Sequence, residues 1–145
     1  MDVAESEPAV DGMRNDWKDL FLSSVGRISR TPFLIACAVL IAVTAIYESI
    51  VGRVMHWITG WIVYPVLVFC AASVLSKRLH DRGRSGWWSA LVLFSVMVIW
   101  PHPVGFLDFL FSLVLVWAVV ELGVMPGEPG ANRYGPNPLN AAAAA

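Results

Sequence analysis

Four long apolar runs dominate the chain, and short polar segments separate them. They cover residues 32–51, 57–76, 86–100 and 104–124. A helix needs about 20 apolar residues to cross the ~30 Å hydrocarbon core of a bilayer, and the first, second and fourth runs have that length. The third has only 15 residues, but tryptophans flank it, as is common at a membrane interface. The pattern predicts an all-α membrane protein with four transmembrane helices.

An amphipathic segment precedes the first apolar run. Trp17, Leu20, Phe21 and Val25 stand at helical spacing and share one face. A short helix of this kind can lie in the headgroup layer with its apolar face towards the lipid. We expect such an interfacial helix, with a helix packed on protein as the alternative.

The composition agrees with a single membrane domain. Hydrophobic residues make up 57% of the chain and charged residues 14%, against about 45–50% and about 25% in soluble domains. A small soluble domain could not bury that much apolar surface. Residues 1–14 are acidic and predicted to be disordered, so the membrane domain covers residues 15–140. Its last part is rich in glycine, proline and asparagine and predicts consecutive turns without a helix; the alanines at 141–145 are either native or an added tail.

Lysine and arginine are divided unevenly between the polar segments. Only Arg53 stands on one side of the four predicted helices. The others are Arg14, Lys18, Arg27, Arg30, Lys77, Arg78, Arg82, Arg84 and Arg133. Loops rich in these residues stay in the cytoplasm, so both termini and the middle loop are predicted to be cytoplasmic. The net charge of −1 gives no indication of a nucleic-acid partner.

The densest group of polar side chains is KRLHDRGRSGWW, at residues 77–88. Structurally, it predicts the end of one helix, a tight turn and the start of the next helix. Cations favour a helix C-terminus, and Gly83 suits the left-handed residue of the turn. Arginines and a free helix N-terminus also suit phosphate. We favour a structural role with general lipid contact over a specific anion site, and both over catalysis.

The sequence offers no strong catalytic or metal-binding pattern. His80 and Asp81 are adjacent, so on a helix they point about 100° apart and make a poor metal pair. Cys37 and Cys70 lie inside apolar runs, which is typical of buried thiols. We find neither a phosphate-binding glycine loop nor a serine with a partnered base. We therefore expect no enzymatic activity, no metal and no cofactor.

Three carboxylates fall inside the apolar runs: Glu48, Asp108 and Glu121. Ionisable groups within a membrane are costly and often functional. Asp108 and Glu121 face different directions on a straight helix, which argues against a single proton path along the fourth run. We expect Glu48 to pair with Arg53, and Glu121 to pair with the basic middle loop.

Three motifs together resemble a known family. They are GRISR at 26–30, RLHDRGRSGWW at 78–88 and GANRYGPNP at 130–138. In this order and spacing they are similar to the bacterial inner-membrane proteins catalogued as domain of unknown function 805. The family usually follows its first motif with an acidic residue, Phe and Trp, where this chain has Thr31-Pro32-Phe33-Leu34. The resemblance implies a small multi-pass inner-membrane protein with all three motifs cytoplasmic, and it implies no activity.

From these observations we expect the three motifs to meet on one cytoplasmic surface that binds an anionic lipid headgroup or a protein partner. The candidate residues are Arg27, Arg30, Arg78, Asp81, Arg82, Arg84, Asn132, Arg133 and Tyr134. The alternative function is a small transporter or channel, with a polar cavity lined by the intramembrane carboxylates. An enzyme acting on lipid would instead need a cleft that holds His80 and Asp81 together. Pairs of small residues such as Ala38 and Ala42 allow close helix contacts within the bundle, with a second copy or with another membrane protein.

Overall fold

The computed structural model of the protein describes residues 17–99 and 105–143, and this part of the chain is helical, without a β-strand. The helices are α1 (Trp17–Leu22), α2 (Arg30–Ile50), α3 (Arg53–Asp81), α4 (Trp88–Ile99), α5 (Phe106–Ala118), the π-helical turn η2 (Val119–Val124) and α6 (Pro138–Ala143). The segment 1–14, predicted to be disordered, lies outside the described residues, as do residues 100–104 and 144–145.

The apolar runs become helices of two lengths. Three helices are long and apolar enough to cross a membrane: α2, α3, and α5 continued by η2, which together form one helix of 19 residues over Phe106–Val124. The third run gives the shorter apolar helix α4, which has 12 residues, or ~18 Å at the α-helical rise. The all-helical class is therefore confirmed, whereas the fourth crossing stays a prediction.

Helix α3 is longer than its apolar run predicts. It has 29 residues and continues to Asp81, although the run predicts an end near residue 76. A hydropathy pattern stops at the first charged residues, but the helix continues because Lys77 and Arg78 are buried and paired. Pro65 lies inside the helix.

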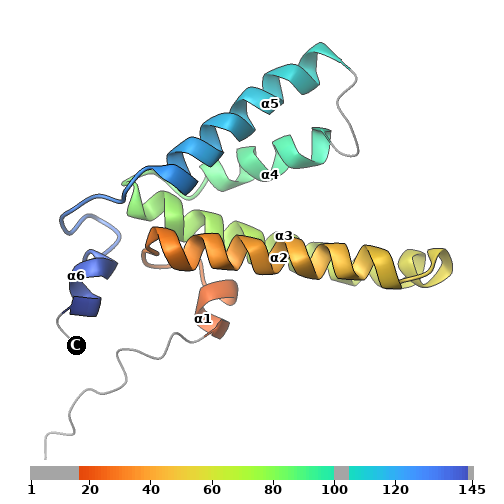
Figure 1. Cartoon of the computed structure of the whole chain (residues 1–145), viewed down its shortest axis with the longest axis horizontal. Helices are drawn as coiled ribbons and strands as arrows, with labels where there is room; N and C mark the ends of the chain where they lie inside the picture. Colours follow the sequence, from red (N-terminus) through yellow and green to blue (C-terminus); the bar gives the residue numbers. More distant parts are fainter. Residues whose placement is uncertain (1–16, 100–104, 144–145) are drawn as a thin grey trace, which may run out of the picture.

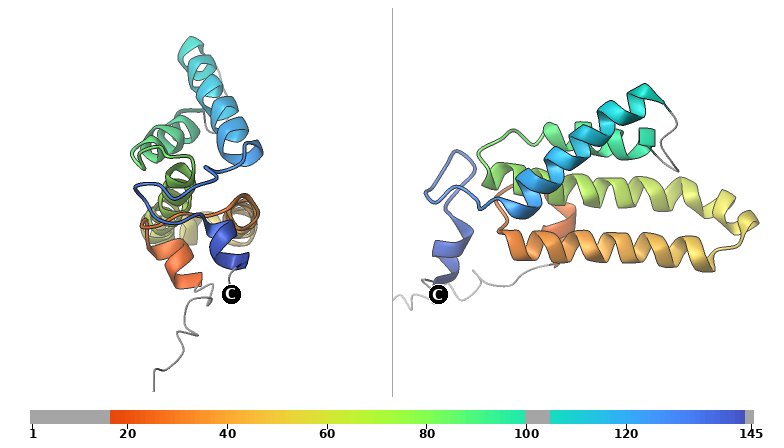
Figure 2. Two further views of the ribbon diagram at one scale, coloured as in Figure 1. Left: turned by 90° about the vertical axis from the view of Figure 1, so that its left-hand side faces the viewer. Right: turned by 45° about the horizontal axis from the view of Figure 1, so that its top comes forward.

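The helices form two hairpins that share one end (Figure 1). Helices α2 and α3 lie side by side, α4 and α5 form the second hairpin, and the two hairpins diverge away from the shared end (Figure 2). The buried apolar cluster lies mostly near that end and comprises Ile28, Phe33, Ala36, Val74, Leu79, Val92, Ala118 and Leu122. Along the rest of the helices, large apolar side chains such as Ile41, Ile62 and Val116 are exposed, as expected of surfaces that face lipid.

Two short helices differ from the simplest expectations. Helix α1 packs against α3, and its Leu20 and Phe21 contact the buried cluster, so the alternative of a helix packed on protein describes it. The prediction of a tail without a helix is wrong, because α6 occupies Pro138–Ala143. Its start combines an Asn137 side chain that accepts a hydrogen bond from the Leu139 amide at 2.9 Å with a proline at the first helical position, and both favour helix initiation.

Candidate functional site

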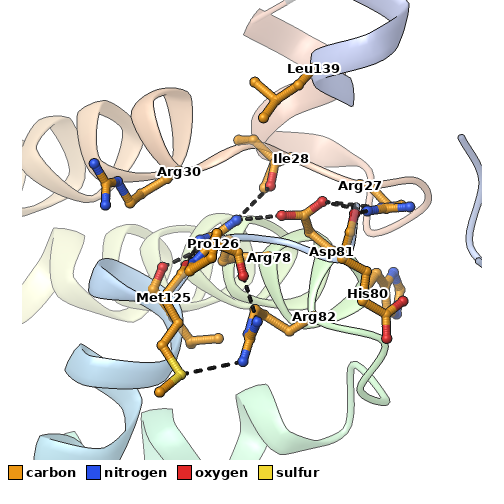
Figure 3. Close-up of polar contacts among 12 residues, drawn as sticks. Arg27, Ile28, Arg30, Arg78, His80, Asp81, Arg82, Met125, Pro126 and Leu139 are labelled. Carbon is orange, nitrogen blue, oxygen red and sulfur yellow. Dashed lines mark hydrogen bonds and ion pairs between the residues drawn. The ribbon is translucent and has the colours of Figure 1, made fainter. Parts of the chain in front are cut away.

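The three sequence motifs meet at the shared end of the two hairpins, around the last turns of α3. Figure 3 shows the contacts of the first two motifs with each other and with Met125 and Pro126. We call this cluster the arginine clasp. It comprises Arg27, Arg78, Arg82 and Arg84, the carboxylates Asp81 and Glu121, and the main-chain carbonyls of residues 122–135 that accept hydrogen bonds from the arginines. Residues more than 100 positions apart in the chain are hydrogen-bonded here, so the expected convergence of the motifs is confirmed.

Arg78 is the centre of the clasp and is fully buried. Its Nε donates to the Leu122 carbonyl at 2.8 Å and its Nη2 to the Met125 carbonyl at 2.6 Å. Its Nη1 donates to Asp81 Oδ2 and, at 3.4 Å, to the Ile28 carbonyl. A buried guanidinium is tolerated only when it is paired and hydrogen-bonded. The side chain therefore ties the end of α3 to the first motif and to the end of η2.

Arg27 approaches the same carboxylate from the other side. Its Nε and Nη2 donate to Asp81 Oδ1 at 3.1 and 3.0 Å. Its remaining donors reach the carbonyls of Glu128 at 2.8 Å and Gly130 at 2.7 Å, and that of Gly135 at 3.2 Å. Asp81 thus lies between two guanidinium groups, and its own side chain is only 3% exposed.

A second carboxylate, Glu121, holds the arginines of the middle loop. Glu121 Oε1 accepts from Arg82 Nη2 at 3.1 Å and from Arg84 Nε at 3.0 Å. The expectation that Glu121 pairs with this loop is confirmed. Glu121 belongs to η2. Arg84 also lies over the Trp117 ring, 5.5 Å from its centroid.

The third motif folds back over the end of α3. The Tyr134 ring stacks on the His80 ring, with centroids 3.8 Å apart and planes 9° from parallel. The Asn132 amide donates to the His80 carbonyl at 2.9 Å and to Glu128 Oε2 at 2.7 Å. Arg133 lies over the Tyr134 ring at 4.8 Å. The tail is therefore held by side chains as well as by main-chain contacts.

Two glycines allow this close packing. Gly83 has φ +68° and forms the left-handed turn predicted after α3. A Cβ atom on Gly127 would lie 2.0 Å from Asp81 Oδ2, so a side chain there would displace the carboxylate that Arg27 and Arg78 share.

The arrangement leaves some cations occupied and others accessible. The donors of Arg27 and Arg78 are directed to internal partners. Arg30 lies to one side of the clasp (Figure 3), is exposed and donates to the Val124 carbonyl at 3.1 Å. Arg133 is also exposed, and the Arg84 side chain is 42% exposed. The hypothesis that all nine candidate residues bind an anion stays a prediction, with these three as its accessible members.

His80 and Asp81 have separate partners. His80 Nδ1 lies 3.2 Å from the Gly26 carbonyl oxygen, and its Nε2 lies 3.4 Å from Ser76 Oγ, whereas Asp81 binds the two arginines. Within residues 17–99 and 105–143, no three His, Cys, Asp or Glu side chains are grouped so that they could hold a metal ion.

The other two intramembrane carboxylates lie away from the clasp. Glu48 contacts His56 at 3.3 Å and accepts a hydrogen bond from Tyr64. The expected pairing with Arg53 is therefore wrong, because α3 turns its His56 and Tyr64 side chains, rather than its first residue, towards the end of α2. Asp108 Oδ2 accepts from the Gly105 amide at 2.8 Å, at the start of α5.

Sequence reasoning missed several contributors to these contacts. Glu128 supplies a carbonyl to Arg27 and a carboxylate to Asn132. Lys77 reaches Asp19 of α1 at 2.8 Å. Glu128 could have been noticed in the sequence, because it stands two residues before the third motif and is the one carboxylate in residues 125–140. Tyr64 stands inside an apolar run and gave no signal.

Comparison with known proteins identifies the same family as the motifs that build the clasp. The model of the family described as "Protein of unknown function (DUF805)" matches residues 21–136, which include the first two motifs and the third up to Pro136. The chain belongs to this family. Its members' activity is unassigned, and three helices of spanning length agree with the membrane location that the motifs imply. No solved structure matches the chain.

Two relatives in Escherichia coli (strain K12) extend this comparison. "Uncharacterized protein YiiR" is 34% identical over 121 residues, which cover 76% of this chain and 82% of that protein. "Inner membrane protein YhaH" is 34% identical over 77 residues, which cover 52% of this chain and 50% of that protein. The chain is thus a bacterial membrane protein from a family without an assigned activity.

Proposed function

We propose that the chain is a non-enzymatic inner-membrane protein that crosses the bilayer four times and whose arginine clasp, on the cytoplasmic side, binds anionic lipid headgroups. The observation that supports this proposal most directly is a surplus of positive charge at the clasp end. Among the described residues, eight cations lie there against four carboxylates. The cations are Lys18, Arg27, Arg30, Lys77, Arg78, Arg82, Arg84 and Arg133, and the carboxylates are Asp19, Asp81, Glu121 and Glu128.

The direction of the chain supports the four crossings. Helix α2 begins at the clasp end, α3 ends there, α4 begins there, and η2 ends there. Each of the four apolar segments therefore has one of its ends at the clasp. The surplus of arginine and lysine there is the charge distribution of a cytoplasmic face. The location of YhaH, an inner membrane protein by name, favours the same membrane.

The accessible arginines in and beside the clasp are the ones that fit lipid contact. Arg30, Arg84 and Arg133 keep much of their surface exposed while their neighbours hold the fold together. A cation near an anionic membrane surface contributes about 1 kcal/mol, and a guanidinium can also donate two parallel hydrogen bonds to a phosphate. The buried arginines thus shape the surface, and the exposed ones contact the headgroup.

The contacts of the carboxylates favour this function over a transporter or channel. Glu121 lies in the clasp and binds two arginines, whereas Glu48 lies at the far end of α2 with His56 and Tyr64. Asp108 stands at the start of α5, also away from the clasp. The three side chains therefore do not line one continuous path. An enzymatic function is disfavoured because His80 and Asp81 do not share a cleft.

The test is retention of lipid by the purified full-length protein, measured by native mass spectrometry after exposure to equal amounts of phosphatidylglycerol and phosphatidylcholine. The double variant Arg30→Gln/Arg133→Gln should lose roughly 5- to 30-fold of its preference for the anionic lipid. The matched control is Arg53→Gln, which removes an exposed cation from the opposite end. It should leave the preference unchanged, because any phosphate contact of Arg53 is common to both lipids. Equal loss in the control, or no loss in the double variant, would reject the clasp end of the molecule as the lipid-binding surface.

A further inference from the structure

A second polar cluster lies at the tip of the α2–α3 hairpin, at the opposite end from the clasp (Figure 1). Glu48 Oε1 accepts a hydrogen bond from the Tyr64 hydroxyl and lies 3.3 Å from His56 Nε2. His56 Nε2 also lies 2.6 Å from the Tyr64 hydroxyl. The other oxygen of the carboxylate has no hydrogen bond within the described parts of the chain, and the Glu48 side chain is 42% exposed. One acceptor therefore remains available at this tip.

Aromatic packing fixes the cluster in place. Tyr47 packs on His56 and on Tyr64, with ring centroids 5.4 and 5.8 Å away, and His56 and Tyr64 lie 5.6 Å apart. The Tyr47 and Thr59 hydroxyls are hydrogen-bonded at 2.8 Å. Such interlocking rings have few alternative arrangements, so the carboxylate is held in position before any ligand arrives.

Next to this cluster is a shallow hollow of about 400 Å³ on α3. It is lined by His56, Trp57, Gly60, Trp61, Tyr64 and Pro65. Trp57 and Trp61 stand four residues apart on the same helix face and are 73% and 77% exposed. Its volume falls within the range of small-molecule sites, which combine aromatic walls with a few fixed polar groups.

We propose that this hollow binds an organic ammonium group. Aromatic faces attract cations through their quadrupole, most strongly for tryptophan, and Glu48 offers the carboxylate oxygen that an ammonium group needs as a partner. Membrane-interface anchoring explains why the two tryptophans are exposed. It does not explain why a histidine and a tyrosine hold a carboxylate beside them.

Two sources could supply the ammonium group: the headgroup of a zwitterionic aminophospholipid, or a free amine. Arg53 stands one helical turn before His56 and Trp57, so it is on the same side of α3. A phospholipid would place its phosphate near this guanidinium while its ammonium group occupies the hollow. A free amine has no phosphate that could contact Arg53, so this residue distinguishes the two sources.

The test uses the purified full-length protein and two probes, phosphatidylethanolamine measured by native mass spectrometry and ethylammonium measured by tryptophan fluorescence. Glu48→Gln should weaken binding of the preferred probe roughly tenfold or more, and Trp61→Leu should weaken it roughly 3- to 10-fold. Trp87→Leu is the control, because Trp87 is 85% exposed but lies beside the clasp.

The possible outcomes distinguish a lipid source from an amine source, and either of these from failure of the proposal. A lipid site is identified if phosphatidylethanolamine retention falls in both variants and also in Arg53→Gln. A site for a free amine is identified if ethylammonium binding falls in both variants and is unchanged in Arg53→Gln. If neither probe distinguishes Glu48→Gln and Trp61→Leu from Trp87→Leu, the hollow is not an ammonium site and its tryptophans are only anchors. Circular dichroism checks that each variant keeps its helices.

Discussion

At the clasp end, side-chain hydrogen bonds join residues up to 108 positions apart in the chain, whereas at the tip of the α2–α3 hairpin they join residues at most 16 apart. The clasp links both hairpins, the first motif and the tail, and the tip links α2 only to α3. In lipid, the hydrophobic effect does not drive helices together, because the lipid tails are equally apolar. The difference teaches that buried arginines and carboxylates supply the long-range polar links between the two hairpins, beside the apolar cluster at the same end.

Removing the charge at the centre of the clasp should have the largest effect. In Asp81→Asn, the buried guanidinium groups of Arg27 and Arg78 lose their shared counter-charge. We expect a loss of about 3–5 kcal/mol in the free energy of unfolding, measured by denaturant titration of the detergent-solubilised protein. The corresponding change at the tip, Glu48→Gln, should cost under about 1 kcal/mol because that carboxylate is partly exposed. Similar losses at the two ends would contradict the comparison.

A purely steric change should have a smaller effect. Gly127→Ala places a methyl group against Asp81 Oδ2 and forces the carboxylate or the tail to move. We expect a destabilisation of about 1–3 kcal/mol, measured in the same titration. Gly130→Ala is the matched control from the same segment, because a Cβ there meets no atom within 4 Å. A Gly130 variant as unstable as the Gly127 variant would show that the tail needs flexibility rather than close approach.

The smallest effect is expected from the tail itself. Tyr134→Leu removes the ring that stacks on His80 and that the Arg133 guanidinium lies over. It should lower the free energy of unfolding by about 0.5–1.5 kcal/mol. Hydrogen exchange of the amides at 128–136 should become faster, while that of α2 and α3 stays unchanged. Tyr134→Phe keeps the ring and should exchange like the wild-type protein. If the phenylalanine variant also exchanges fast, the hydroxyl rather than the stacking holds the tail.

Much of this architecture could be predicted because apolar runs and motif order are properties of the sequence itself. Helix α2 ends within one residue of its apolar run, and Glu121 binds the basic loop as expected. The continuation of α3 to Asp81 could not be predicted from hydropathy, because burial of Arg78 depends on carbonyls that lie 44 and 47 residues later in the chain. The pairing of Glu48 with Tyr64 was equally hidden, because a single tyrosine in an apolar run does not show which carboxylate the fold brings to it.

The long reach of Arg27 also has a consequence for how the protein is made. Its partners at Glu128 and Gly130 are synthesised 101 and 103 residues after it. Chains leave the ribosome from the N-terminus onwards, so the apolar segments are translated before these carbonyls exist. During that interval Arg27 has neither of these partners. The contacts that hold Arg27 in the mature fold can therefore form only after the last apolar segment has been translated.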